Sequence, residues 1–126
     1  MKKFIFAVVL LVCVLAGGIW YQHTVSAFAT EVAGFCDGIE RLAFKGEQQA
    51  LERELERFER YWAKKGIHMS YFIDHVHLND LSKSISELGA AVRSHETTEV
   101  LLTSARVRIE AQTIAKDELF LPENIF

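Results

Sequence analysis

Residues Phe4 to Tyr21 read FIFAVVLLVCVLAGGIWY, an apolar stretch that contains no charged side chain. It exceeds the lower limit of about 17 apolar residues that a helix needs to cross the hydrocarbon core of a bilayer. Trp20 and Tyr21 stand at its far end, where amphipathic aromatic rings favour the headgroup level. The sequence therefore predicts a transmembrane helix, with residues 1–21 as a cytoplasmic stub and membrane anchor. The first expected partner is the lipid bilayer.

Basic residues indicate the orientation of this anchor. Lys2 and Lys3 precede the apolar stretch, and no Lys or Arg follows it until Arg41. Cytoplasmic flanks of membrane helices carry an excess of Lys and Arg. We therefore expect a single-pass protein of the cell membrane, with its N-terminus in the cytoplasm and residues 22–126 forming an extracytoplasmic domain.

A cleaved signal peptide is the alternative reading of the same segment. Two lysines, an apolar core and Ala27-Phe28-Ala29 fit the pattern of such a peptide. The apolar run is longer than a usual signal core, however, and the A-x-A sequence lies well beyond its end. A lipid-modified Cys13 is disfavoured because Val12 is larger than the small residue that usually precedes a lipidated cysteine. The uncleaved anchor is therefore the preferred interpretation.

The composition of residues 22–126 favours a single all-α domain. This part of the chain is long enough for one small core, and strong helix formers dominate it. Proline occurs once, at Pro122. Of the chain's 14 basic and 17 acidic residues, only Lys2 and Lys3 precede residue 22, which leaves 12 basic and 17 acidic residues and a formal charge of −5. An acidic domain is a poor candidate for nucleic acid, so no nucleic-acid partner is expected.

A heptad-like stripe of apolar residues follows the anchor. Steps of three and four residues are typical of a helix that packs along other helices. No proline separates this stripe from the apolar stretch, so the anchor and the first helix of the domain are predicted to form one long rod. The stripe consists of Val25, Phe28, Val32, Phe35, Ile39 and Leu42.

Three more amphipathic segments are predicted, and together they suggest an antiparallel bundle of three to four helices. Lys45-Gly46 predicts the end of the first helix, since glycine readily adopts a left-handed cap. Lys64-Lys65-Gly66 predicts the end of the second in the same way. The expected helices are 47–65, 68–94 with a possible bend at Asn79-Asp80, and 96–119 with Ser94 as its N-cap. The tail Leu121–Phe126 is expected to fold back onto the bundle.

Small residues recur every four positions along the first helix of the domain. Ser26, Thr30, Gly34 and Gly38 would permit close approach by a neighbouring helix, and they are the interface candidates. The alternative is that small residues occur there only because this face of the helix makes no contact that requires a particular side chain.

Cys36 is a lone thiol beyond the anchor, because the other cysteine, Cys13, lies inside the apolar stretch. Two interpretations stay open. Either Cys36 is buried and inert, or it pairs with another chain and has a redox or pairing role.

The sequence lacks the usual catalytic and nucleotide-binding motifs, so no catalytic residue and no cofactor are expected. One dense group of functional side chains contains Asp74, His75 and His77. Asp74 and His77 are spaced i, i+3, a spacing that serves metal ligands in helical bundles. These three residues are the weak metal candidates. The preferred alternative is structural, with acids and histidines at a helix junction satisfying each other and the backbone.

Several segments in order resemble a family of small single-pass membrane proteins of Gram-positive bacteria, known as domain of unknown function 4363. The similar features span nearly the whole chain. The resemblance implies a membrane-tethered helical domain and supplies no activity. His77 and Asn79 depart from the family pattern, which is more acidic just after the histidine. The similar features are the two-lysine start with its apolar anchor, Trp62, Phe72-Ile73-Asp74-His75, the stripe from Leu78 to Leu88, and Glu123-Asn124-Ile125-Phe126.

The sequence as a whole favours a non-enzymatic, membrane-anchored helical module with a protein-interaction or structural role. Its expected partner is another membrane protein or a second copy of the chain. The alternative function is a small ligand- or metal-binding sensor built around Asp74, His75 and His77.

Overall fold

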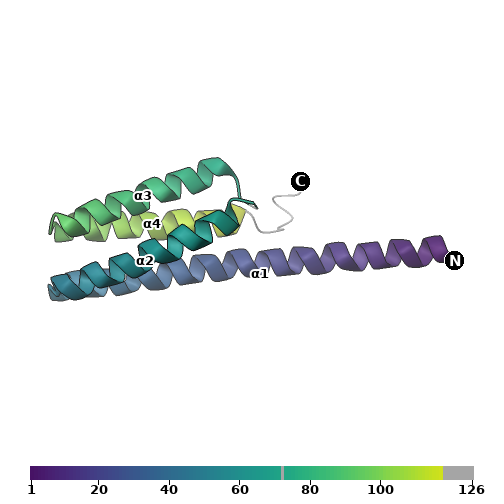
Figure 1. Cartoon of the computed structure of the whole chain (residues 1–126), viewed down its shortest axis with the longest axis horizontal. Coiled ribbons are helices and arrows are strands. Elements are labelled where there is room, and N and C mark those ends of the chain that lie inside the picture. Colours follow the sequence, from purple (N-terminus) through teal and green to yellow (C-terminus); the bar gives the residue numbers. More distant parts are fainter. Residues whose placement is uncertain (72, 118–126) are drawn as a thin grey trace.

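The computed structural model describes residues 1–71 and 73–117, and within them the protein consists of four helices and no strand. The helices are α1 (Lys2–Lys45), α2 (Gln48–Met69), α3 (His75–Arg93) and α4 (Thr97–Asp117). Consecutive helices run in opposite directions and are joined by short connections (Figure 1). The predicted all-α antiparallel bundle is confirmed.

Helix α1 is a single rod, as predicted, and only its second half belongs to the bundle. Its first half extends well beyond the other helices (Figure 1), and the side chains of the apolar stretch are exposed, for example Phe4 and Leu11. From Val25 onward one face of α1 turns into the core. The predicted boundary between residues 21 and 22 therefore falls inside a continuous helix.

The core lies between the second half of α1 and the other three helices. Helix α1 packs against α4 and α2, and α3 completes the bundle by packing against α4 and α2. The heptad stripe of α1 supplies four fully buried side chains, while Phe35 and Leu42 lie at the edge of the core. Other fully buried large side chains are Leu55, Phe58, Met69, Leu81, Leu88, Val92, Val100 and Ile114.

Two helix ends share one backbone motif. At the end of α1, Gly46 has a φ of 75°, and the amides of Gly46 and Glu47 donate to the carbonyls of Ala43 and Leu42. This paired bonding is the Schellman motif, so the helix end predicted at Lys45-Gly46 is confirmed. At the end of α3 the same bonds form around His95, a non-glycine residue with a φ of 59°.

The helix end predicted at Lys64-Lys65-Gly66 is wrong, because α2 continues to Met69. Gly66 stays helical, and the position of its absent Cβ lies 3.5 Å from the ring of Trp62. Met69 and Ile73 are almost fully buried. Burial of these apolar side chains offsets the cost of about 1 kcal/mol that a glycine imposes inside a helix.

The third and fourth helices also differ from the prediction in their boundaries. Helix α3 begins at His75 rather than His68 and passes through Asn79-Asp80 without a break. Ser94 is the C-cap of α3, not the N-cap of α4. The carbonyl of Glu96 accepts the first bond of α4, from the amide of Val100. The predicted docking of the tail Leu121–Phe126 falls outside the described residues.

Candidate functional site

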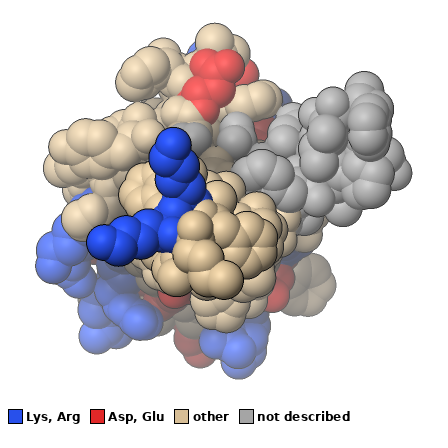
Figure 2. Space-filling view, turned by 90° about the vertical axis from the view of Figure 1, so that its right-hand side faces the viewer, with Lys and Arg blue, Asp and Glu red and all other residues tan. Residues whose placement is uncertain are grey.

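The bundle has two distinct ends relative to the apolar half of α1. The connections α1–α2 and α3–α4 lie at the far end, whereas the α2–α3 connection lies at the end from which the apolar stretch emerges (Figure 1). We call the latter the proximal end, which consists of residues 64–71 and 73–78: the last turns of α2, the first turn of α3 and the described residues between them. Figure 2 looks along α1 from its N-terminal tip toward the bundle, and Lys and Arg side chains are seen at the centre and along the left and lower edge of this view.

Asp74, the first of the metal candidates, caps a helix. Its Oδ1 atom accepts a 3.0 Å hydrogen bond from the amide of Val76, two residues further along. Aspartate at this position satisfies one of the amide groups that the first turn of a helix leaves without a partner. The structure thus gives Asp74 a backbone role at the helix junction.

His75 and His77 lie in the first turn of α3 but in different surroundings. His75 is exposed and lines a shallow hollow of about 360 Å³ between α2 and α3. On the wall of that hollow, the Trp62 indole nitrogen donates a 3.1 Å hydrogen bond to the Ser82 hydroxyl. His77 is half-buried. Across residues 1–71 and 73–117, no group of three or more His, Cys, Asp or Glu side chains is placed so that it could hold a metal ion.

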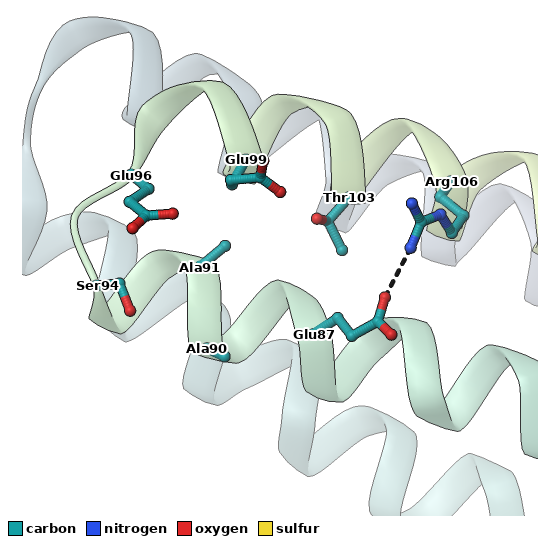
Figure 3. Close-up of a pocket in the computed structure, with 8 residues that line it drawn as sticks. All are labelled: Glu87, Ala90, Ala91, Ser94, Glu96, Glu99, Thr103 and Arg106. Carbon is teal, nitrogen blue, oxygen red and sulfur yellow. Dashed lines mark hydrogen bonds and ion pairs between the residues drawn. The ribbon is translucent and has the colours of Figure 1, made fainter.

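A second hollow of about 290 Å³ lies between α3 and α4 near their far-end connection. Figure 3 shows its lining: Glu96, Glu99 and Ser94 stand at the turn, and Glu87 and Arg106 face each other further along the helices. The Arg106 guanidinium donates a 2.6 Å hydrogen bond to the Glu87 carboxylate, and both side chains are exposed. The hollow is open and its one cation is paired with Glu87, and an exposed ion pair of this kind adds little to the packing of α3 against α4.

Cys36 is fully buried between α1 and α4, and its backbone carbonyl accepts a 3.4 Å hydrogen bond from the Ser104 hydroxyl. Burial disfavours the thiolate and raises the pKa of Cys36 to about 11. Its side chain is therefore a neutral thiol at physiological pH. The structure places Cys36 in the buried situation that was one of the two sequence interpretations.

The small-residue stripe mostly faces outward. Ser26, Thr30 and Gly34 are exposed, and the Thr30 hydroxyl donates a 3.0 Å hydrogen bond to the carbonyl of Ser26. Nothing lies within 4 Å of the Cβ position of Gly34, whereas that of Gly38 is 3.4 Å from the Glu54 carboxylate. The first three residues thus leave a smooth strip of α1 uncovered by the rest of the described chain.

Side-chain hydrogen bonds that the sequence did not reveal connect α1 to its neighbours. On the α4 side, the Arg108 guanidinium donates a 2.9 Å hydrogen bond to Glu40 and a second hydrogen bond to Asp37. The bond to Glu40 is the main reason that the pKa of Arg108 is raised above its usual value. Arg108 lies about 70 positions from both acids along the chain, so no local pattern could have identified these contacts.

On the α2 side, the Tyr61 hydroxyl donates a hydrogen bond to the Glu31 carboxylate. Partial burial and this neighbouring carboxylate both raise the pKa of Tyr61 above its usual value. The rings of Tyr61 and Phe58 each stack at an angle against Phe35, with centroids 5.2 and 5.1 Å away. Helix α1 is therefore held on two sides within the bundle, at Glu31 by α2 and at Asp37 and Glu40 by α4.

Comparison with known proteins gives a family but no characterised relative. No curated protein and no solved structure matches the chain. One family model, described as "Domain of unknown function (DUF4363)", matches residues 19–125. The match begins at the end of the apolar stretch and covers the whole bundle. The chain therefore belongs to the DUF4363 family.

Proposed function

We propose that the protein is a single-pass, membrane-anchored helical module without catalytic activity, which binds another membrane protein or a second copy of itself outside the cytoplasm. The observation that carries this proposal is the continuity of α1. One helix of 44 residues forms both the apolar stretch and one side of the bundle core.

The exposed half of α1 supports the membrane assignment. This helix is long and apolar enough to cross a bilayer, and none of its most apolar window is buried in the molecule. A core helix of a soluble protein with similar composition would be mostly buried. Side chains such as Phe4, Ile5 and Trp20 are more than half exposed. A continuous apolar surface of this kind is unfavourable in water and is covered when the helix lies in hydrocarbon.

The packing of α1 argues against cleavage after Ala27-Phe28-Ala29. Val25 and Phe28 are fully buried and Ala29 is nearly so. Removal of residues 1–29 would take these side chains out of the core and leave α2 without part of its packing surface. An uncleaved anchor keeps the bundle intact.

The outward strip of α1 is the part of the bundle best placed for a partner within the membrane. It continues directly from the apolar stretch. The small side chain of Thr30 and the absence of one at Gly34 leave room for another helix to approach closely. A second membrane helix that packs along the anchor could therefore continue along this strip without a steric obstacle. Within the described residues, no observation favours the alternative of a metal-binding sensor, because Asp74 is used by the backbone of α3.

Site-specific photo-crosslinking in living cells tests the proposal. A photoreactive phenylalanine analogue replaces Thr30 in the full-length chain, and the matched control carries it at Ser86, an exposed small residue of α3. We expect an adduct with a membrane protein or with a second copy from position 30 and a much weaker one from position 86. No adduct from position 30, together with a monomeric protein in mild detergent, would overturn the interaction role.

A further inference from the structure

The contacts between α1 and α2 fix the height of the α2–α3 connection relative to the apolar stretch. Trp62 lies against Phe28 with ring centroids 6.0 Å apart, Tyr61 bonds Glu31, and the Glu54 carboxylate lies beside Gly38. The two helices run antiparallel, so each residue further along α2 lies about one residue nearer to the anchor. Continuing this pairing from Trp62 brings Met69 level with positions 21–23 of α1.

This register places the proximal end at the boundary of the proposed membrane span. Ile67 and Tyr71 lie two residues on either side of Met69, which at about 1.5 Å per helical residue is a height difference of only a few ångströms. On α3, the hydrogen bond between Trp62 and Ser82 sets Val76 at a similar height. The headgroup layer on each side of a bilayer is roughly 5–7 Å thick. All three side chains therefore fall within the headgroup layer when Trp20 and Tyr21 mark the end of the span.

The side chains at this height have the character of a membrane-contacting surface. Ile67, Tyr71 and Val76 are 63 %, 79 % and 63 % exposed, although they are large and apolar or amphipathic. Lys64 is also exposed and Lys65 is half-buried, one turn further from the span. Apolar side chains flanked by lysines are typical of protein segments that lie in the interface, with the lysines directed to anionic headgroups.

We propose that the proximal end, through Ile67, Tyr71, Val76, Lys64 and Lys65, rests on the outer headgroup layer of the same membrane that α1 crosses. The inference rests on the proposed membrane anchor, which brings this end to the bilayer. The lysines favour anionic lipid, and the exposed carboxylate of Asp74 at the same end reduces this preference. Two points of attachment, the span and the proximal end, then fix how the bundle rotates about α1 and hence which way the strip with Thr30 faces.

Depth-resolved fluorescence on the full-length protein in liposomes tests the proposal. A Cys13→Ser background receives one environment-sensitive label at a time, through Tyr71→Cys at the proximal end, Phe44→Cys at the far end or Leu11→Cys in the span. Cys36 is buried as a thiol and so reacts little. The liposomes contain phosphatidylcholine with or without phosphatidylglycerol. Iodide quenches labels from the water, and a nitroxide on the lipid headgroup quenches them from the membrane.

We expect the label at position 71 to be quenched by the nitroxide lipid and to be several-fold less sensitive to iodide than the label at position 44. Equal sensitivity to iodide at positions 71 and 44, with position 11 protected, would overturn the proposal while leaving the anchor intact. Exposure of position 11 to iodide would overturn the anchor and the proposal together. Protection of position 71 from both quenchers would mean that protein rather than lipid covers this end, which also overturns it.

A charge-reversal variant separates a lipid contact from a structural effect. The double substitution Lys64→Glu and Lys65→Glu is introduced into the chain that carries the label at position 71. It should increase iodide quenching in liposomes with phosphatidylglycerol and change it little in phosphatidylcholine alone. A label at Val76→Cys should follow the same pattern. An equal response in both lipids would contradict a role for the lysines in binding anionic headgroups.

Discussion

The ring of Phe28 on α1 lies 6.0 Å from the ring of Trp62 on α2, with the two planes tilted by 37°. Trp62 in turn donates its indole N–H to Ser82 on α3. This chain of contacts links three helices at the level where the apolar stretch of α1 enters the bundle. The second half of α1 is therefore packed directly against α2 and, through Trp62, linked to α3.

Phe28 should contribute strongly to the stability of the bundle. Its side chain is fully buried, so Phe28→Ala should destabilise the bundle by about 3–5 kcal/mol through lost burial and the cavity left behind. Phe44→Ala is the matched control on the same helix, because Phe44 is 84 % exposed, and it should cost less than about 0.5 kcal/mol. Denaturant unfolding of the full-length protein in micelles measures both. Equal losses would mean that α1 does not pack in the bundle as described.

The two Schellman motifs predict opposite effects on stability when a glycine is introduced at the end of α3 and when one is removed at the end of α1. His95 pays the steric cost of the left-handed conformation, so His95→Gly should stabilise the protein by about 1 kcal/mol. Gly46→Ala, at the corresponding position of α1, should destabilise it by about 1 kcal/mol. Thermal melting in micelles compares the two variants. A loss of stability in His95→Gly would contradict the backbone geometry at the end of α3.

Stability should decrease at alkaline pH because the buried thiol of Cys36 and the half-buried hydroxyl of Tyr61 hold their protons more tightly in the folded state. The pKa of Cys36 is raised from 9.0 to about 11, and that of Tyr61 is raised above 10.0. The unfolded chain releases these protons at lower pH than the folded chain does. The stabilisation that the two groups give the folded state is therefore complete below pH 9 and is lost as the pH rises. Cys36 alone adds a slope of at most about 1.4 kcal/mol per pH unit between its two pKa values.

Unfolding free energies measured from pH 8 to 11.5 check this expectation. Cys36→Ala should remove the part of the decline that begins near pH 9, and Tyr61→Phe should remove the part that begins near pH 10. A decline of the same size in wild type and in both variants would assign it to other groups.

Asp74 should contribute to the stability of the protein as a helix cap and not as a metal ligand. Asp74→Ala removes the bond to the amide of Val76 and should cost about 1 kcal/mol, whereas Asp74→Ser keeps a capping oxygen and should cost less. Zinc or nickel added to the wild-type protein should leave its melting temperature unchanged. A metal-dependent rise in melting temperature that is lost in His77→Ala would revive the metal-binding sensor.

The sequence was informative where one local rule decides the structure. The heptad spacing of Val25, Phe28, Val32 and Ile39 identified the buried face of α1, because side chains at that period return to one side of a helix. Gly46 marked a true helix end because the chain adopts the left-handed conformation there, which glycine does without a steric cost. Gly66 carried the same local signal and misled, since burial of apolar residues beyond it decides the end of α2.

The site features depended more on tertiary structure. A structural role for Asp74 at a helix junction was the preferred interpretation, but its position as N-cap was not predicted because the third helix was expected to begin near His68. The bond between Arg108 and Glu40 was not predictable, because it depends on the register between α1 and α4. The position of Tyr71 at the height of Trp20 likewise emerges only from the pairing of α1 with α2.

Intact-mass analysis of the protein purified from cell membranes tests the continuity of anchor and bundle most directly. We predict that the species in the membrane fraction keeps the uncleaved mass of 14.3 kDa and yields the tryptic peptide of residues 4–41, which spans Ala27-Phe28-Ala29. The measurement requires no variant and no assumption about the partner. A mature chain that begins at Thr30, released from the membrane, would contradict the central claim that α1 is both the anchor and a core helix of the bundle.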